Sequence, residues 1–246
     1  MKYLLTLSYL GTAYCGWQVQ RNAVSVQSRL QDAVQAVLGK RYPVTGCSRT
    51  DSGVHADGFC CTIETDNAAP SISPASLPFA LNCALPHDIA VQSAREVPHD
   101  FHPRYDAVRK IYRYLIWNAP CRSPLYHGRA WHCPRHLDAE TMCRAAQPLI
   151  GQHDFAAFCA AGSSVTDTVR TLYALRVERQ DDLITVTAEG NGFLYKMVRI
   201  LCGTLADAAL GRLDPDGIAD ILQSRDRGRA GQTLPPEGLY LHRVVY

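Results

Sequence analysis

The chain has 246 residues, of which 47% are hydrophobic and 20% are charged, so it can bury a substantial core as one large domain or two closely packed halves. Its net charge of +2 at pH 7 is too small to indicate a nucleic-acid partner by itself. Polar residues and glycine interrupt the short apolar run in residues 1–17, which argues against a signal peptide or a membrane span. We therefore expect a cytoplasmic protein with no membrane partner.

The ten cysteines do not indicate disulfides, because a chain of this size needs no covalent staples and a cytoplasmic protein meets a reducing compartment. We expect most of them to be buried thiols. No C-x-x-C pair is present, since Cys60 and Cys61 are adjacent and Cys121, Cys133 and Cys143 lie far apart. This spacing predicts no structural metal site.

The first hundred residues are predicted to begin with a strand and a helix. Leu5, Leu7 and Tyr9 alternate with polar residues, and a helical period then runs from an N-cap at Ser25 to Gly39. Short strands are expected at 43–50 and 58–65, a polar loop at 66–76 and another strand at 88–97. The segment between the first two of these short strands is therefore a connection, where functional groups tend to be displayed.

The rest of the chain repeats this mixture of strands and helices. The longest strand candidate is 107–118, on which Val108, Lys110, Tyr112, Tyr114 and Ile116 share one face. A helix from Asp138 to Gly151, a hairpin turning at Asp181 and Asp182, a last helix at 193–210 and a closing strand at 238–246 follow. This order predicts an α+β duplication with a central, mostly antiparallel sheet.

The segment Ser48–Gly58, "SRTDSGVHADG", carries several side chains able to do chemistry. Asp51 could be a turn residue, one carboxylate of an acid/base pair with Asp57, a metal ligand with His55 and Asp57, or a lone nucleophile. Arg49 lies two residues before Asp51, so in an extended segment the two side chains project to the same side. A neighbouring guanidinium favours the ionised form that a catalytic carboxylate needs.

A second cation lies on the last predicted helix, which is apolar nearly all round and therefore expected to be buried. Arg199 projects from this apolar surface. It needs a carboxylate partner from elsewhere in the chain, unless its long side chain reaches solvent.

Basic and aromatic residues alternate in 102–113, "HPRYDAVRKIYR". This combination suits RNA, because cations bind phosphates and flat rings stack on unstacked bases. The alternative is an ordinary solvated charged strand and loop.

Five ordered segments resemble one family, the tRNA pseudouridine synthase A family. "GCSRTDSGVHADG" looks like its catalytic motif, usually written G-R-T-D-x-G-V-H-A. The other four matching segments are "GTAYCGWQVQ…SVQSRL", "DFHPRYDAVRKIYRY", "FLYKMVRILCGTL" and "PPEGLYL". They follow the family order from residue 8 to the C-terminus, so the resemblance covers essentially the whole chain.

The resemblance implies an isomerase without a cofactor that converts uridine to pseudouridine in the anticodon stem-loop of tRNA, at tRNA positions 38, 39 and 40. It implies that Asp51 is the catalytic aspartate, that Tyr112 stacks on the target uracil and that Arg199 is the cation paired with the aspartate. Arg49 and Arg104 fall in matching motifs and would serve the site or the flipped-out nucleotide. Departures from the family pattern at Cys47-Ser48, Phe59 and Lys196 remove no required group.

The resemblance also implies a fold of two related, ferredoxin-like α+β halves that form one continuous, mostly antiparallel sheet with a central active-site cleft. The expected halves are 1–103, with the aspartate loop, and 104–246, with the tyrosine strand and the Arg199 helix. Family members act as homodimers. Two alternatives stay open at this point: an RNA-binding protein without catalysis, and a metal-dependent hydrolase that uses Asp51, His55 and Asp57.

Overall fold

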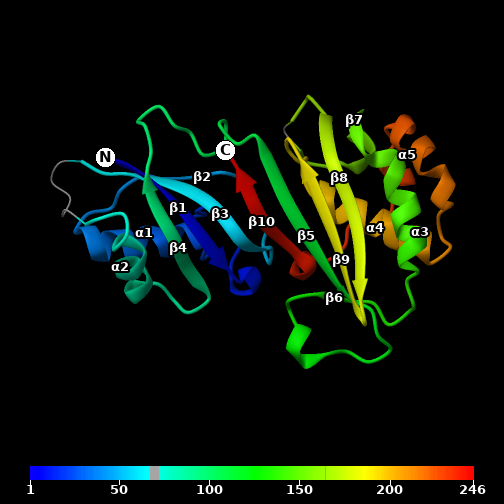
Figure 1. Ribbon diagram of the computed structural model, residues 1–246, viewed down its shortest axis with the longest axis horizontal. Helices are drawn as coiled ribbons and strands as arrows, with labels where there is room; N and C mark the ends of the chain where they lie inside the picture. Colours follow the sequence, from blue (N-terminus) through cyan, green and yellow to red (C-terminus); the bar gives the residue numbers. More distant parts are fainter. Residues whose placement is uncertain (67–71, 164) are drawn as a thin grey trace. The chain divides into compact units, whose positions relative to one another are not determined.

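The computed structural model describes residues 1–66, 72–163 and 165–246, which form two compact units. Unit 1 comprises residues 1–108 and 240–246, and unit 2 comprises residues 109–239 (Figure 1). The chain thus passes from one unit to the other after Val108, whereas the predicted halves divide at residue 103, and its last residues return to unit 1. Among the described residues, no helix is long and apolar enough to cross a membrane.

Unit 1 is an antiparallel sheet with two helices. Its strands are β1 (Lys2–Tyr9), β2 (Val44–Gly46), β3 (His55–Glu64), β4 (Ile89–Glu96) and β10 (Leu239–Val245), and its helices are α1 (Val26–Leu38) and α2 (Leu77–Ala84). β1 lies between β3 and β4 and is antiparallel to both, β2 is antiparallel to β3, and β10 is parallel to β3. The helices pack against each other, and α2 contacts β4. This strand order is that of a ferredoxin-like half.

Unit 2 is likewise made of mostly antiparallel strands and of helices. Its strands are β5 (Arg109–Trp117), β6 (Trp131–His132), β7 (Gly151–Asp154), β8 (Val169–Gln180) and β9 (Leu183–Gly190), and its helices are α3 (Ala139–Ala146), α4 (Met197–Ala209) and α5 (Ile218–Ser224). The order is β5-β9-β8-β7, with β6 parallel to β5. Helix α3 packs against α4 and β8, and alternate residues of β9 are buried. Both units are therefore α+β, as the sequence predicts.

Local signals in the sequence explain several element boundaries. Ser25 accepts the backbone N–H of Ser28 in a capping box, and Gly39 ends α1 in the left-handed conformation with φ of 74°. Asp138 caps α3 through two backbone N–H groups, and Asp181 turns the β8–β9 hairpin with φ of 53°. The sequence-based assignments of these two helix starts and of the hairpin are confirmed.

Other boundaries differ from prediction. β3 begins at His55, so the second half of the motif Ser48–Gly58 is strand rather than connection. Helix α3 ends at Ala146, because Pro148 lies in the 3₁₀ turn that follows, and Gly151 opens β7. Helix α4, predicted to begin at 193, begins at Met197, because Lys196 takes the left-handed conformation just before it.

The sequence prediction also missed or misjudged some elements. Helix α5 was not predicted, and the apolar segment before β4 is helix α2. The longest strand is β8 rather than β5. The predicted loop at 66–76 lies partly outside the described residues.

Candidate active site

Asp51 lies in unit 1, in the loop between β2 and β3, and its side chain is half-buried. The predicted turn is present: the backbone N–H of Val54 donates to the Asp51 carbonyl at 3.2 Å, and Gly53 has φ of 79°. Because glycine adopts this conformation without steric cost, the D-S-G sequence forms the turn locally. The turn reading of Asp51 is therefore compatible with a carboxylate displayed on that turn.

The segment 14–17 clamps this loop through its backbone. The Tyr14 carbonyl accepts the Gly53 N–H at 3.3 Å and the Ser52 hydroxyl at 3.2 Å, while the Trp17 N–H donates to the Thr50 carbonyl at 3.1 Å. The same segment is attached to the start of α1, where the Val26 N–H donates to the Gly16 carbonyl. The loop is thus fixed on both sides of Asp51 by main-chain hydrogen bonds.

Gly16 permits this clamp. It has φ of 82°, and a Cβ atom added there would lie 2.4 Å from the Thr50 carbonyl oxygen and 3.1 Å from the Asp51 carbonyl carbon. Real Cβ atoms do not approach so closely, so any side chain would displace the loop. The sequence reasoning missed this residue, although a glycine in "YCGW" just before a helix cap is a signal for a close backbone approach.

Tyr14 is also fixed by its side chain. Its hydroxyl donates to Asp88 Oδ1 at 2.5 Å, and burial together with this hydrogen bond raises the pKa of Tyr14. The hydroxyl therefore stays protonated and keeps donating across the physiological range. On the other side of the clamp, the Tyr9 and Thr50 hydroxyls lie 2.9 Å apart in a buried position.

Arg49 and Arg104 also lie in unit 1, and both are exposed. The segment around Arg49 is not extended strand, so the same-side argument that placed its guanidinium next to Asp51 does not apply. Within the described parts of the chain, Arg49 forms no ion pair. Arg104 lies on a turn after β4.

The side chains of His55 and Asp57 contact other segments of unit 1. The buried His55 accepts the Gly11 N–H at Nδ1 over 2.8 Å, and its ring stacks on Tyr240 of β10 at 4.7 Å. Asp57 Oδ2 lies 3.2 Å from His242 Nδ1, also on β10. These contacts give both side chains a structural role at the start of β3.

Tyr112 lies in unit 2, on β5, opposite Ala188 of β9. Its side chain is 7% exposed, and the edge of the Phe193 ring meets it at 5.1 Å with an interplanar angle of 78°. The alternation predicted for this strand is confirmed, since Tyr112, Tyr114 and Ile116 are all buried. Phe193, which was predicted to lie in the last helix, instead lies in the loop that precedes it and orients the Tyr112 ring.

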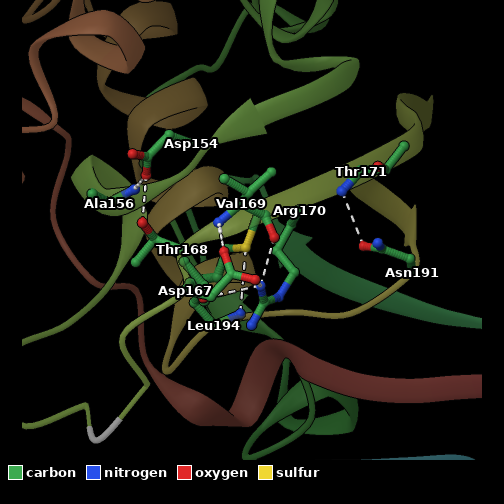
Figure 2. Close-up of polar contacts among 10 residues, drawn as sticks. Asp154, Ala156, Asp167, Thr168, Val169, Arg170, Thr171, Asn191 and Leu194 are labelled. Carbon is green, nitrogen blue, oxygen red and sulfur yellow. Dashed lines mark hydrogen bonds and ion pairs between the residues drawn. The ribbon is translucent and has the colours of Figure 1, made fainter. Parts of the chain in front are cut away.

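The loop 191–196 is fastened to the start of β8, as Figure 2 shows. Asn191 and Thr171 exchange two hydrogen bonds, at 2.9 and 3.1 Å, and the Arg170 guanidinium donates to the carbonyls of Asp167 and Val169. Nearby, Asp154 Oδ1 accepts the Thr168 hydroxyl, which lowers the pKa of Asp154 and keeps it ionised. The Asn191–Thr171 pair holds the loop that carries Phe193, and the other contacts hold the segment at the start of β8.

Arg199 lies in unit 2 on α4, a helix whose residues are nearly all buried, as predicted. Its side chain is half-buried, and its Nε donates to the Leu234 carbonyl at 2.6 Å while the Leu234 N–H donates back to the Arg199 carbonyl at 3.3 Å. This reciprocal pair fixes the position of the guanidinium at its Nε. Leu234 was not identified from the sequence.

The segment 231–234 packs on α4 at backbone distance. The Gly231 N–H donates to Thr204 Oγ1 at 2.9 Å and the Gln232 N–H donates to the buried Asp207 at 3.3 Å. A Cβ atom at Gly203 would lie 1.8 Å from the Gln232 carbonyl oxygen. Glycine in the middle of α4 therefore allows the contact that positions Arg199.

The described residues contain no group of three or more His, Cys, Asp or Glu side chains close enough to hold a metal ion. All ten cysteines are free thiols, but only half are buried, fewer than the sequence analysis predicted, because several lie on loops and helix surfaces. Burial raises the pKa of the Cys61 and Cys202 thiols, so both stay protonated and inert.

The family model for tRNA pseudouridine synthase matches residues 6–106 and 145–246, which is well over half of the chain. The chain belongs to the tRNA pseudouridine synthase family. The resemblance read from the sequence motifs is thereby confirmed, and the match in two segments agrees with two related halves. The family places this synthase among the isomerases of the pseudouridine synthase class.

Full-length relatives support this membership. The synthase is 46% identical over 243 residues to tRNA pseudouridine synthase A of Thermoanaerobacter sp. (strain X514), which covers 99% of this chain and 98% of the relative. It is 44% identical over 246 residues to the protein of the same name from Ruminiclostridium cellulolyticum, with 100% and 99% covered. At this identity and coverage, no large insertion or missing region separates this synthase from these relatives.

Proposed function

We propose that this protein isomerises uridine to pseudouridine in the anticodon stem-loop of tRNA, at positions 38, 39 and 40, and that Asp51 is its catalytic carboxylate. The observation that carries the proposal is a half-buried carboxylate on a loop clamped by main-chain hydrogen bonds, in a chain of the tRNA pseudouridine synthase family. A carboxylate held in this way is pre-organised for chemistry on a substrate.

The reaction breaks the N1–C1′ bond of the nucleotide, turns the uracil and rejoins it to the ribose through C5. The C5 proton is lost to solvent and N1 gains one, so the product is an isomer and neither a redox cofactor nor ATP is consumed. One carboxylate suffices in either of two routes. Asp51 attacks C1′ as a nucleophile, or it removes the C2′ proton to give a glycal.

Tyr112 and Arg199 are proposed to serve the same uridine from unit 2. A base in a stem is inaccessible while it is stacked, so the enzyme must extrude it at a cost of about a few kcal/mol. The Tyr112 ring, held edge-on by Phe193, would stack on the extruded uracil. The Arg199 guanidinium, oriented by Leu234, would supply the cation that the family resemblance assigns to the catalytic aspartate.

The exposed Arg49 and Arg104 are proposed to bind phosphates around the target nucleotide. In this proposal unit 1 supplies the carboxylate and phosphate-binding cations, and unit 2 supplies the stacking ring and the second cation. We further propose a cytoplasmic homodimer, following the family resemblance. Light scattering that gives the mass of a single chain at micromolar concentration would contradict the dimer.

Release of tritium from tRNA labelled at C5 of uridine tests the activity, because the C5 hydrogen leaves only when the base is rejoined through C5. The wild-type chain is expected to release tritium, and Asp51→Asn to release none while still binding tRNA. Asp57→Asn is the matched control, since it removes a carboxylate from the adjoining strand that instead pairs with His242. Substantial turnover by Asp51→Asn, or an equal loss in both variants, would rule out Asp51 as the essential carboxylate.

A further inference from the structure

An exposed turn in unit 1, residues 102–106, carries an aromatic side chain to which the proposed function gives no role, Tyr105, beside the basic side chain of Arg104. Tyr105 is 73% exposed, and Arg104 beside it is exposed as well. Throughout the described residues, no carboxylate lies within ion-pair distance of Arg104. A large ring and an unpaired cation are thus presented to solvent at one place on the surface.

Hydrogen bonds within the turn fix its backbone and so keep Arg104 and Tyr105 in place. The His102 ring accepts two backbone N–H groups at Nδ1, from Arg104 at 3.1 Å and from Tyr105 at 3.3 Å. Asp106 closes the turn, since its carboxylate accepts the His102 N–H at 2.9 Å and its own N–H donates to the His102 carbonyl at 3.0 Å. The one carboxylate in the turn is therefore directed at its backbone.

The back of the turn is anchored to unit 1. Pro103 is buried, and its carbonyl accepts the hydroxyl of Tyr246 at 2.9 Å. The Tyr246 ring packs on Phe101 at 5.0 Å, and the guanidinium of Arg95 lies 5.9 Å from the centre of the Phe101 ring. One face of the turn is thus fixed to the body of the unit while Arg104 and Tyr105 project outward.

The exposed groups form a preassembled set of flat surfaces. The Tyr105 ring lies 4.3 Å from the His102 ring at an interplanar angle of 34°, and the Arg104 guanidinium is 5.7 Å from the centre of the Tyr105 ring. Rings and guanidinium planes of this kind stack on unpaired nucleobases, and a free guanidinium binds phosphate through paired N–H groups. Ordering such a surface before binding lowers the entropy cost of association.

We propose that this turn is a second RNA contact, in which Tyr105 stacks on an unpaired base next to the target uridine and Arg104 binds an adjacent phosphate. The inference rests on the proposed function for the identity of the RNA. Charge complementarity favours RNA as the occupant, because the only cation of the turn faces outward and its only carboxylate faces the backbone. The turn then serves affinity and substrate register, whereas Asp51 serves the chemistry.

The first test measures affinity without turnover, in the Asp51→Asn chain with a synthetic anticodon arm as the probe. Adding Tyr105→Ala is expected to raise Kd about 5- to 100-fold, the range seen when one base loses an aromatic stacking partner. Tyr105→Phe keeps the ring and is expected to restore binding. Phe79→Ala is the matched control, since Phe79 on α2 is 76% exposed and no cation of the described residues lies over its ring.

A second measurement reports the contact directly. Tyr105→Trp is expected to show fluorescence quenching when the arm is added, beyond the background from Trp17, Trp117 and Trp131 in the parent chain. In the active chain, Tyr105→Ala is expected to raise KM for tRNA and to leave kcat nearly unchanged. If Tyr105 had a purely structural role, Tyr105→Ala would instead lower the unfolding midpoint of the chain.

The outcomes separate this inference from the proposed function. If the wild-type chain releases no tritium, the proposed function fails. If the wild type is active and Tyr105→Ala binds the arm as tightly as its parent, the inference alone is overturned. A change in oligomeric mass with unchanged RNA affinity would assign the turn to a contact with a second copy of the chain, and would overturn it as well.

Discussion

Unit 1 presents Asp51 on an irregular loop, whereas unit 2 presents Tyr112 and Arg199 on a strand and a helix. The loop is held by backbone hydrogen bonds from the segment 14–17, which can approach only because one residue there has no side chain. The strand and the helix need no such help, because their own hydrogen bonds fix the backbone. The first arrangement is therefore sensitive to any added side chain, and the second to the neighbours that orient each functional group.

In unit 2, neighbouring residues contact these two side chains and orient them. Phe193 meets the ring of Tyr112 edge-on, and the Leu234 carbonyl accepts a hydrogen bond from Arg199 Nε. Both neighbours lie outside regular elements, so their loss would leave the strand and the helix in place. Substitutions can thus test the two units separately.

Gly16→Ala is expected to have the largest effect, at least a 100-fold loss of kcat, because the new Cβ would displace the Thr50 carbonyl and with it the Asp51 loop. Gly39→Ala is the matched control: φ at Gly39 is 74°, and no other atom would lie within 4 Å of its Cβ. Both variants should lose about 1 kcal/mol of stability from positive φ. Urea unfolding and tritium release measure the two effects, and equal activity in both variants would contradict the loop argument.

Arg199→Lys is expected to lower kcat about 10- to 100-fold while leaving the positive charge. Lysine has no Nε donor in the side-chain plane, so it loses the Leu234 carbonyl and the fixed direction of the guanidinium. Arg176→Lys, at an exposed position on β8, is the control for a general cost of replacing arginine. Wild-type turnover by Arg199→Lys would show that charge alone, and not its orientation, is needed.

Replacement of Tyr112 is expected to have the smallest effect and to depend on the ring. Tyr112→Leu should lower kcat/KM about tenfold through lost stacking, while Tyr112→Phe keeps most of the turnover because the ring still meets Phe193 and the base. Single-turnover tritium release compares the two variants. A Phe variant as impaired as the Leu variant would assign the main role to the hydroxyl and not to stacking.

Much of the fold follows from local signals that act over a few residues. The cap at Ser25, the left-handed Gly39, the N-cap at Asp138 and the turn at Asp181 each depend on side chains or glycines within one turn of the boundary. Where the prediction of the last helix was wrong, the backbone conformation of a single residue outweighed the apolar periodicity. Lys196 takes the left-handed conformation, so the apolar period that suggested a helix from 193 marks a loop instead.

The candidate site was accessible from the sequence only in part. The motif around Asp51 and the alternation around Tyr112 are visible because the residues are close along the chain. The clamp at Gly16, the ring contact of Phe193 and the carbonyl of Leu234 join residues that are tens of positions from the groups they hold. No periodicity reports such contacts.

The sequence by itself determined the family, the α+β class and the residues proposed for the chemistry, because these depend on motifs and short-range periodicity. Only the tertiary structure decided that β10 returns to unit 1, that Arg49 is exposed, and that Asp106 turns its carboxylate away from the surface that Arg104 and Tyr105 present. The physical reason is that strand pairing, side-chain exposure and the direction of a hydrogen bond depend on which distant backbone lies alongside.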